Sequence, residues 1–116
     1  MEFYNQFHKL SIEDRIIKSN NIKDVYFPKL PVLIDRFQHT DPLIKKNKFL
    51  VEPGLYFHEF MIIIRKYIAL QPSQAFFLLY NNSPIPMNQT IGEWYHHNPT
   101  EDGFINIVYC VESTFG

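Results

Sequence analysis

The residue of this 116-residue chain with the clearest chemical potential is its last, Gly116. Glycine has no side chain, so a terminal glycine presents a carboxylate that can reach into a narrow enzyme site without obstruction. Such a carboxylate can be activated and transferred to a nucleophile. Because many chains end in glycine by chance, the weight of this signal depends on the residues around it.

A second possible site of chemistry combines Cys110 with His96 and His97, as in a cysteine–histidine nucleophile. Cys110 lies within an apolar stretch that favours a strand, and no acidic residue is placed to orient a histidine, so a buried thiol is the better interpretation. The adjacent histidines should point apart, and they lack further ligands at zinc spacing. The chain also has no phosphate-binding glycine loop and no paired carboxylates. We therefore expect no enzyme activity, no metal and no cofactor.

The third candidate is a binding site, at Lys48 to Val51. This run favours a strand, and the period of two sends Lys48 and Leu50 to one face and Phe49 and Val51 to the other. If it is an edge strand, its N–H and C=O groups can accept an extended peptide as an added strand. Pockets on the two faces would then select the side chains of the peptide.

Composition places the chain among small globular proteins. Hydrophobic residues make up 46% and aromatic residues 16%, enough for one core, and a single cysteine excludes an internal disulfide framework. No uninterrupted apolar stretch comes near the roughly 20 residues that span a bilayer, and the N-terminus lacks a signal-peptide pattern. We expect a cytoplasmic chain that is soluble before any modification.

Charge is unevenly distributed along the chain. All 11 lysines and arginines lie at or before Lys66, so residues 1–66 carry a net charge of +3 and residues 67–116 a net charge of −4. A basic face would attract acidic peptides or an anionic membrane, although an ordinary solvated surface explains the asymmetry equally well. The overall net charge of −1 is weak for a protein that binds RNA, so we expect no nucleic-acid partner.

The first half of the chain is predicted to form helices followed by two strands. Ser11, with an acidic residue three positions later, resembles a capping box and predicts a helix over residues 12–20. A further short helix is expected over residues 3–10. Residues 32–34 are an apolar run that favours a first strand, and residues 48–51 favour a second strand that a Pro-Gly pair ends.

The second half contains the main helix. Apolar residues recur at three and four positions over residues 56–68, which predicts an amphipathic core helix. A strand over residues 76–80 ends in a turn at Asn81-Asn82, a capping box opens a short helix over residues 90–96, and residues 104–111 form the last strand. The order matches an α+β fold, the ubiquitin-like β-grasp, with a four-stranded mixed sheet and a central helix preceded by two short N-terminal helices.

Several motifs, in order and at matching spacing, resemble one family. The strongest is KNKFLVEPGLYFHEFMIIIRK, at Lys46 to Lys66. Asn81-Asn82 with the proline-containing loop after them, Glu101 to Phe104, and the closing Glu112 to Gly116 follow in the same order. In these motifs the chain resembles the autophagy-related ubiquitin-like modifiers, the family that includes GABARAP, as a divergent member. The resemblance covers nearly the whole chain.

This resemblance implies an N-terminal helical extension over residues 1–24, a β-grasp domain over residues 25–111 and an extended conjugation tail over residues 112–116. It implies that Gly116 is adenylated, carried as a thioester on enzyme cysteines and transferred to the amine of phosphatidylethanolamine. The implied partners are activating and conjugating enzymes, a deconjugating cysteine protease, and cargo receptors and autophagy proteins with aromatic-x-x-aliphatic motifs. The conjugated protein would lie on autophagosome or vesicle membranes.

The resemblance also assigns two pockets beside residues 48–51. The implied aromatic-binding pocket consists of Ile22, Pro31, Lys48, Leu50 and Phe104, and the implied aliphatic-binding pocket consists of Phe49, Val51, Leu55, Phe60 and Ile63. The basic residues implied beside the added strand are Lys29, Lys46, Lys48 and Arg65. A second docking patch is implied at Phe77 and Leu79. For Phe60, Ile63 and this second patch, ordinary burial in the core is the competing interpretation.

The alternative function is a β-grasp adaptor that binds partner peptides and is never conjugated. Both hypotheses use the same peptide site beside residues 48–51. They differ in whether the carboxylate of Gly116 becomes linked to a lipid, so an assay of lipid transfer separates them.

Overall fold

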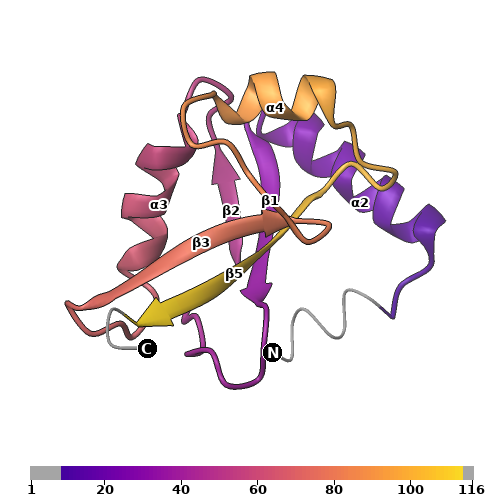
Figure 1. The fold of residues 1–116 in the computed structure, drawn as a ribbon. Coiled ribbons are helices and arrows are strands. Elements are labelled where there is room, and N and C mark those ends of the chain that lie inside the picture. The colour runs from indigo at the N-terminus through magenta and orange to yellow at the C-terminus, as the bar shows by residue number, and fades with distance from the viewer. Residues whose placement is uncertain (1–8, 114–116) are drawn as a thin grey trace.

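The computed structural model describes residues 9–113, which form a five-stranded mixed sheet with three helices (Figure 1). Along the chain the elements are α2 (Ile12–Val25), β1 (Leu30–Arg36), β2 (Lys48–Val51), α3 (Phe57–Arg65), β3 (Gln74–Tyr80), β4 (Ser83–Pro84), α4 (Ile91–His97) and β5 (Ile105–Ser113). The strand order is β2-β1-β5-β3-β4, with β1 and β5 parallel and the other pairs antiparallel. The predicted α+β, ubiquitin-like β-grasp is confirmed.

The sheet has five strands where the sequence predicted four, because β4 was missed. This strand is two residues long and contains Pro84, so it carries no strand periodicity. It pairs with the end of β3 across the turn at Asn81 and Asn82, whose φ angles of 49° and 65° are the left-handed values that such a tight turn requires. The turn predicted at these two asparagines is therefore confirmed.

The helices begin at the predicted caps, but their ends differ from the predictions. Ser11 Oγ accepts a hydrogen bond from an N–H of the first turn at 3.1 Å, and α2 is longer than predicted. α3 ends at Arg65 because Ile68 leaves the helix and forms a β-bridge with Ile44. Most of the helix expected over residues 3–10 lies outside the described residues.

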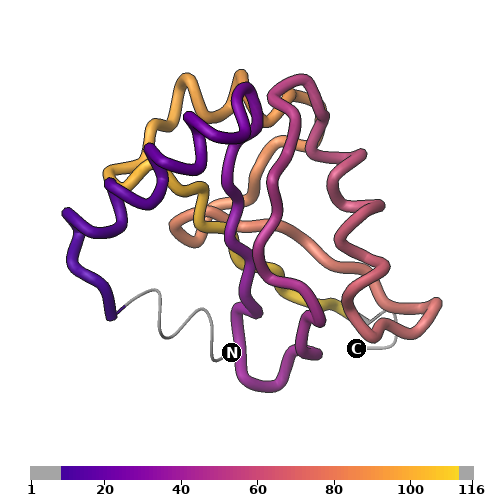
Figure 2. The backbone as a smooth tube through the Cα atoms, turned by 180° about the vertical axis from the view of Figure 1, so that it is seen from behind, coloured from indigo at the N-terminus to yellow at the C-terminus, as the bar shows by residue number. Residues whose placement is uncertain are grey.

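β1 is covered on both faces, and this sets the layers of the fold. Its residues 31–34 are all buried. On one face Val32 joins the main core with α3 and α4, whereas on the other face Leu33 packs with Phe104 and with Ile22 of α2. The helices α2 and α3 therefore lie on opposite sides of the sheet (Figures 1 and 2). Burial on both faces explains the continuous apolar run in the sequence of β1.

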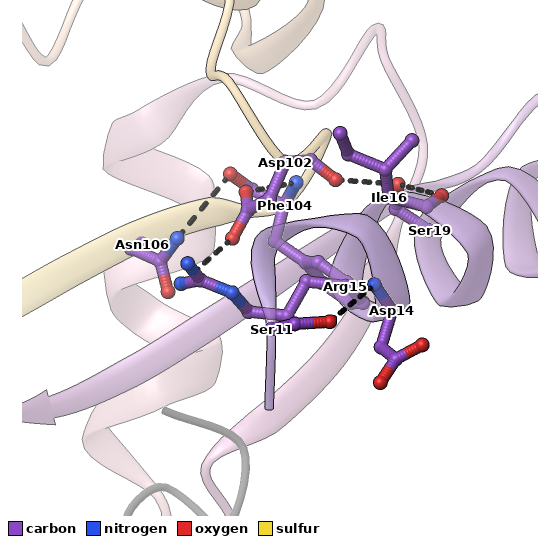
Figure 3. A network of polar contacts seen from close by, with 8 residues as sticks. All are labelled: Ser11, Asp14, Arg15, Ile16, Ser19, Asp102, Phe104 and Asn106. Carbon is purple, nitrogen blue, oxygen red and sulfur yellow. Dashed lines mark hydrogen bonds and ion pairs between the residues drawn. The ribbon is translucent and has the colours of Figure 1, made fainter. Parts of the chain in front are cut away.

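A polar network ties α2 to the loop before β5 (Figure 3). Ser19 Oγ donates to the Asp102 carbonyl oxygen at 2.6 Å, and the Arg15 guanidinium lies 3.5 Å from the Asp102 carboxylate. The same carboxylate accepts the Phe104 N–H at 3.0 Å. Ser19 is the buried residue of α2, so these polar contacts help to position the helix alongside the apolar packing of Ile22.

The loop between β1 and β2, residues 37–47, is anchored on β5. The Asp41 carboxylate accepts the Val111 N–H at 3.3 Å, and Tyr109 Oη donates to the Pro42 carbonyl oxygen. Burial, followed by the charges of two nearby aspartates, raises the pKa of Tyr109 to about 12, so its hydroxyl remains a donor at physiological pH. These contacts hold the loop beside the last residues of β5.

We predict that Gly103→Ala loosens α2. Gly103 has a φ of +84°, and a Cβ there would lie 2.4 Å from Ser19 Oγ, inside the polar network. Backbone strain and the clash together should lower the free energy of unfolding by about 2 kcal/mol or more. Gly54→Ala is the matched control, since a Cβ at Gly54 meets nothing within 4 Å. Chemical denaturation measures both, and equal stabilities would contradict this account.

Candidate functional site

β2 is an edge strand of the described sheet, with β1 as its neighbour. In their antiparallel register the Ile34 N–H donates to the Asn47 carbonyl oxygen at 2.9 Å. Antiparallel ladders bond at every second pair, so Phe49 bonds back to β1, whereas the N–H and C=O of Leu50 point away from β1. The main chain of Leu50 therefore faces the edge where a further strand can be added.

The side chains of β2 alternate between the two faces of the sheet. On the face covered by α2, Lys48 is exposed and Leu50 is half-buried. On the face covered by α3, Phe49 and Val51 are each 5% exposed. The candidate residues therefore form two groups, on opposite sides of one edge strand.

The residues expected to form the aromatic-binding pocket come together on the α2 face. Leu50 lies opposite Pro31 in the ladder, so their side chains share this face with Lys48. Phe104 is buried there, and Ile22 packs against the cluster that contains it. Pro31 and Phe104 are buried beneath this face, while the half-buried Ile22 and Leu50 supply its accessible apolar surface.

The residues expected to form the aliphatic-binding pocket also come together, on the α3 face, but three of them are core. Phe49, Val51 and Phe60 are buried in the main core, and Leu55 and Ile63 pack against it half-buried. Leu55 and Ile63 therefore supply most of the accessible surface of this group.

Tyr67 was missed by the sequence reasoning, although it lies beside this second group. The Phe49 ring meets the rings of Phe60 and Tyr67 edge to face, each at a centroid distance of 5.5 Å. Lys46 Nζ lies 4.8 Å from the centroid of the Phe49 ring and 5.7 Å from that of Tyr67, within cation–π range. The sequence placed Tyr67 inside the helix predicted over residues 56–68, and nothing in it pointed to packing against a particular strand.

The other basic residues face different surroundings. The Arg65 guanidinium donates to the carbonyl oxygens of Gln74 at 3.2 Å and Gln71 at 3.4 Å, so it holds the loop before β3. Lys29 precedes β1, whose first residue pairs with the last residue of β2, whereas Lys48 begins β2. These two exposed lysines therefore lie toward opposite ends of the edge.

Phe77 and Leu79 of β3 are accessible, so the competing interpretation of core burial is wrong for Phe77. The core side of β3 is formed by Phe76 and Leu78, which are 5% and 1% exposed. Phe77 is 44% exposed and pairs with Cys110 across the ladder to β5, while Leu79 is half-buried.

Cys110 is half-buried, and burial, followed by the charge of Asp41, raises the pKa of its thiol. A protonated thiol is a weak nucleophile. The rings of His96 and His97 do not point apart as expected but meet at a centroid distance of 5.2 Å. Within residues 9–113 no group of three His, Cys, Asp or Glu residues could hold a metal ion, and no helix has the length and apolarity to cross a membrane.

The C-terminal candidate lies outside the described residues. β5 continues through Ser113, which pairs with Gln74 at the start of β3, and Gly116 follows beyond it. A mixed sheet in the order β2-β1-β5-β3-β4, with parallel central strands β1 and β5 and with α3 packed on one face, is the fold of the ubiquitin-like class of proteins.

Comparison with known proteins identifies the branch of that class. The family model described as "Autophagy protein Atg8 ubiquitin like" matches residues 14–116, and the chain belongs to this Atg8 family of autophagy proteins. It is 34% identical over 107 residues to autophagy-related protein 8B of Oryza sativa subsp. indica, covering 91% of this chain and 90% of the relative. It is 35% identical over 106 residues to autophagy-related protein 8c of Arabidopsis thaliana, covering 90% and 89%.

A solved structure gives the same result for the fold. The crystal structure of Trypanosoma brucei ATG8 matches with a TM-score of 0.80 at 25% sequence identity, over 92% of this chain and 93% of that chain. The expected resemblance to autophagy-related ubiquitin-like modifiers is thereby confirmed at the level of both sequence and fold.

We predict that the two neighbouring β2 substitutions Phe49→Ala and Leu50→Ala differ sharply in their effect on stability. Phe49 is core, so its truncation should cost about 3–5 kcal/mol of unfolding free energy. Leu50 is half-buried, so its truncation should cost less than about 2 kcal/mol. Urea denaturation of both variants measures this, and similar losses would show that β2 is not seated as described.

Proposed function

We propose that this Atg8-family chain is a modifier that is joined through Gly116 to phosphatidylethanolamine and that then recruits autophagy proteins with aromatic-x-x-aliphatic motifs. The observation that carries the proposal is the edge strand β2, whose two faces each present apolar residues beside an outward-facing main chain. The match of the family model through residue 116 supports the role of the tail.

Peptide binding by strand addition follows from the geometry of β2. The N–H and C=O of Leu50 point away from β1, so an extended peptide can bond to them without disturbing the sheet. Main-chain bonds of this kind are the same for any sequence. They provide attachment, while selectivity must come from the side chains that flank the strand.

The spacing of the motif matches the two groups of residues. In an extended peptide, residues three positions apart point to opposite faces, because side chains alternate with a period of two. The aromatic residue would lie over Ile22 and Leu50 on the α2 face, and the aliphatic residue would lie against Leu55 and Ile63 on the α3 face. An aromatic-x-x-aliphatic segment can therefore use both groups at once.

Basic residues along the edge favour acidic residues that flank the motif. Lys29, Lys46 and Lys48 are exposed. Exposed ion pairs contribute only about 0–1 kcal/mol each, and salt screens them, so these lysines would adjust affinity rather than create it. Arg65 is committed to carbonyl groups of the loop before β3 and would contribute less.

Lipid attachment would proceed by acyl transfer carried out by the activating and conjugating enzymes. The Gly116 carboxylate first attacks the α-phosphorus of ATP, which releases pyrophosphate and forms an adenylate. An enzyme thiolate then displaces AMP to form a thioester, and the lipid amine finally displaces the thiolate to form an amide. The two acyl chains of the lipid contribute about 0.8 kcal/mol per buried methylene, which anchors the domain firmly. A deconjugating cysteine protease would reverse the attachment by hydrolysing the amide.

We predict that deletion of Gly116 abolishes lipid conjugation without changing stability, because this residue follows β5, which ends at Ser113. The measurement is the lipid-linked product formed with activating enzyme, conjugating enzymes, ATP and phosphatidylethanolamine vesicles. Glu112→Ala, an exposed change at the end of β5, is the control and should retain conjugation. Absence of any product from the unaltered chain, with peptide binding retained, would favour a non-conjugated adaptor.

We predict that Leu50→Ala weakens a motif peptide through its aromatic residue, whereas Ile63→Ala weakens it through its aliphatic residue. Truncations at the centre of an interface often cost about 2 kcal/mol, which is roughly thirtyfold in affinity. Calorimetric titration of one peptide and its two single-alanine versions against each variant forms a double-mutant cycle.

Ile62→Ala is the matched control for this cycle. Ile62 is also on α3, but it is 64% exposed and belongs to neither the α2-face nor the α3-face group of candidate residues. It should bind all three peptides as the unaltered chain does. Equal coupling of Leu50→Ala to both peptide positions would contradict the assignment of the two faces.

A further inference from the structure

The end of the domain from which the tail leaves carries a surface that the peptide site does not use. Phe37 is 45% exposed and Leu43 is 56% exposed, both on the loop between β1 and β2. Lys45 and Lys66 are exposed beside them. We call these four residues the tail-end surface.

Main-chain hydrogen bonds fix two parts of the tail-end surface to neighbouring segments. The Phe37 N–H donates to the Tyr109 carbonyl oxygen at 2.8 Å, which fixes the main chain of Phe37 beside β5. The Lys45 N–H donates to the Tyr67 carbonyl oxygen at 2.8 Å, so Lys45 and Lys66 lie on neighbouring segments. Figures 1 and 2 both show this loop at the same end of the molecule as the end of β5.

The covalent length of the tail limits how far a bound lipid can lie from this surface. Residues 114–116 follow Ser113, the last residue of β5. Three residues span at most about 11 Å, so a lipid headgroup bonded to Gly116 is kept close to the end of β5. The Asp41 carboxylate, which accepts the Val111 N–H at 3.3 Å, keeps the loop at that same end.

We propose that the tail-end surface is a contact site for an anionic lipid membrane, on which the conjugated domain rests; this rests on the proposed lipid linkage. Phe37 and Leu43 would enter the interface between headgroups and acyl chains, and Lys45 and Lys66 would face anionic headgroups. The exposed carboxylate of Glu112 on β5 opposes these two lysines, and Lys46 is left to the peptide site, where its Nζ lies over the Phe49 ring. Contact at this end leaves the β2 edge available to peptides.

Chemical coupling tests this contact without the conjugating enzymes. The full chain, extended by one C-terminal cysteine and carrying Cys110→Ser, is coupled to a maleimide lipid in vesicles of phosphatidylcholine and phosphatidylserine. Leu43→Trp places a reporter on the tail-end surface. Phe27→Trp is the matched control, because Phe27 is 83% exposed and precedes β1 at its opposite end. The native Trp94 is 4% exposed and provides the background.

Vesicles whose acyl chains carry bromine should cause a loss of emission from the reporter at position 43 but not at position 27. Lys45→Glu combined with Lys66→Glu should remove that loss, because each unit charge near an anionic surface changes binding roughly fivefold. Equal quenching at both positions, or quenching at position 43 that survives charge reversal, would overturn the proposal. If the emission at position 43 changes with the number of protein chains per vesicle rather than with the lipid composition, the surface contacts a second copy of the chain. That result would also overturn the proposal.

Since the tether is chemical, these outcomes do not depend on enzymatic conjugation. A chain that fails in the conjugation assay but is quenched at position 43 would refute the proposed function and retain the contact surface. The converse result would retain the proposed function and refute the contact surface.

Discussion

The fold depends on the need to cover β1 on both faces. Residues 31–34 are buried on each side, which a strand can achieve only between two layers. α3 and α4 cover one side through the main core, and α2 covers the other through Leu33, Phe104 and Ile22. With β5 as the other neighbour of β1, β2 becomes an edge strand with a distinct surface on each face. The candidate peptide site is a product of this layering.

The α2 face of the site is less securely built than the α3 face. The α3 face is supported by the main core around Phe49, whereas Ile22 is brought to β2 by a helix whose buried residue is Ser19. The bond from Ser19 to the Asp102 carbonyl oxygen and the ion pair of Arg15 with Asp102 therefore position one wall of a site that they do not touch (Figure 3). This polar network thus helps to set the position of Ile22 in the candidate peptide site.

Local signals in the sequence predicted the fold well. The caps at Ser11 and Thr90, the Asn81-Asn82 turn and the alternation along β2 all depend on neighbouring residues, and the structure has each of them. Strand β4 was missed because its two residues are too few for a strand pattern, whereas the misses around α3 depend on contacts distant in the sequence. The bridge of Ile68 to Ile44 ends α3 early, and the packing of Tyr67 on Phe49 joins segments that no spacing connects. The roles of Gly116 and of the pocket residues depend on contacts with enzymes, lipids and peptides, and a single sequence does not contain these contacts.

The unequal faces of β2 also determine how accurately a ligand is aligned. Main-chain hydrogen bonds repeat every two residues and cannot by themselves distinguish one alignment from the next. A peptide that slips by one residue sends both anchors to the wrong sides, and a slip by two moves each anchor about 7 Å past its contacts. Phe49 and Val51 are already core, so the α3 face has little room for a misplaced aromatic ring. If β2 binds peptides as proposed, it would select them for the alignment of their two anchor residues as well as for the identity of those residues.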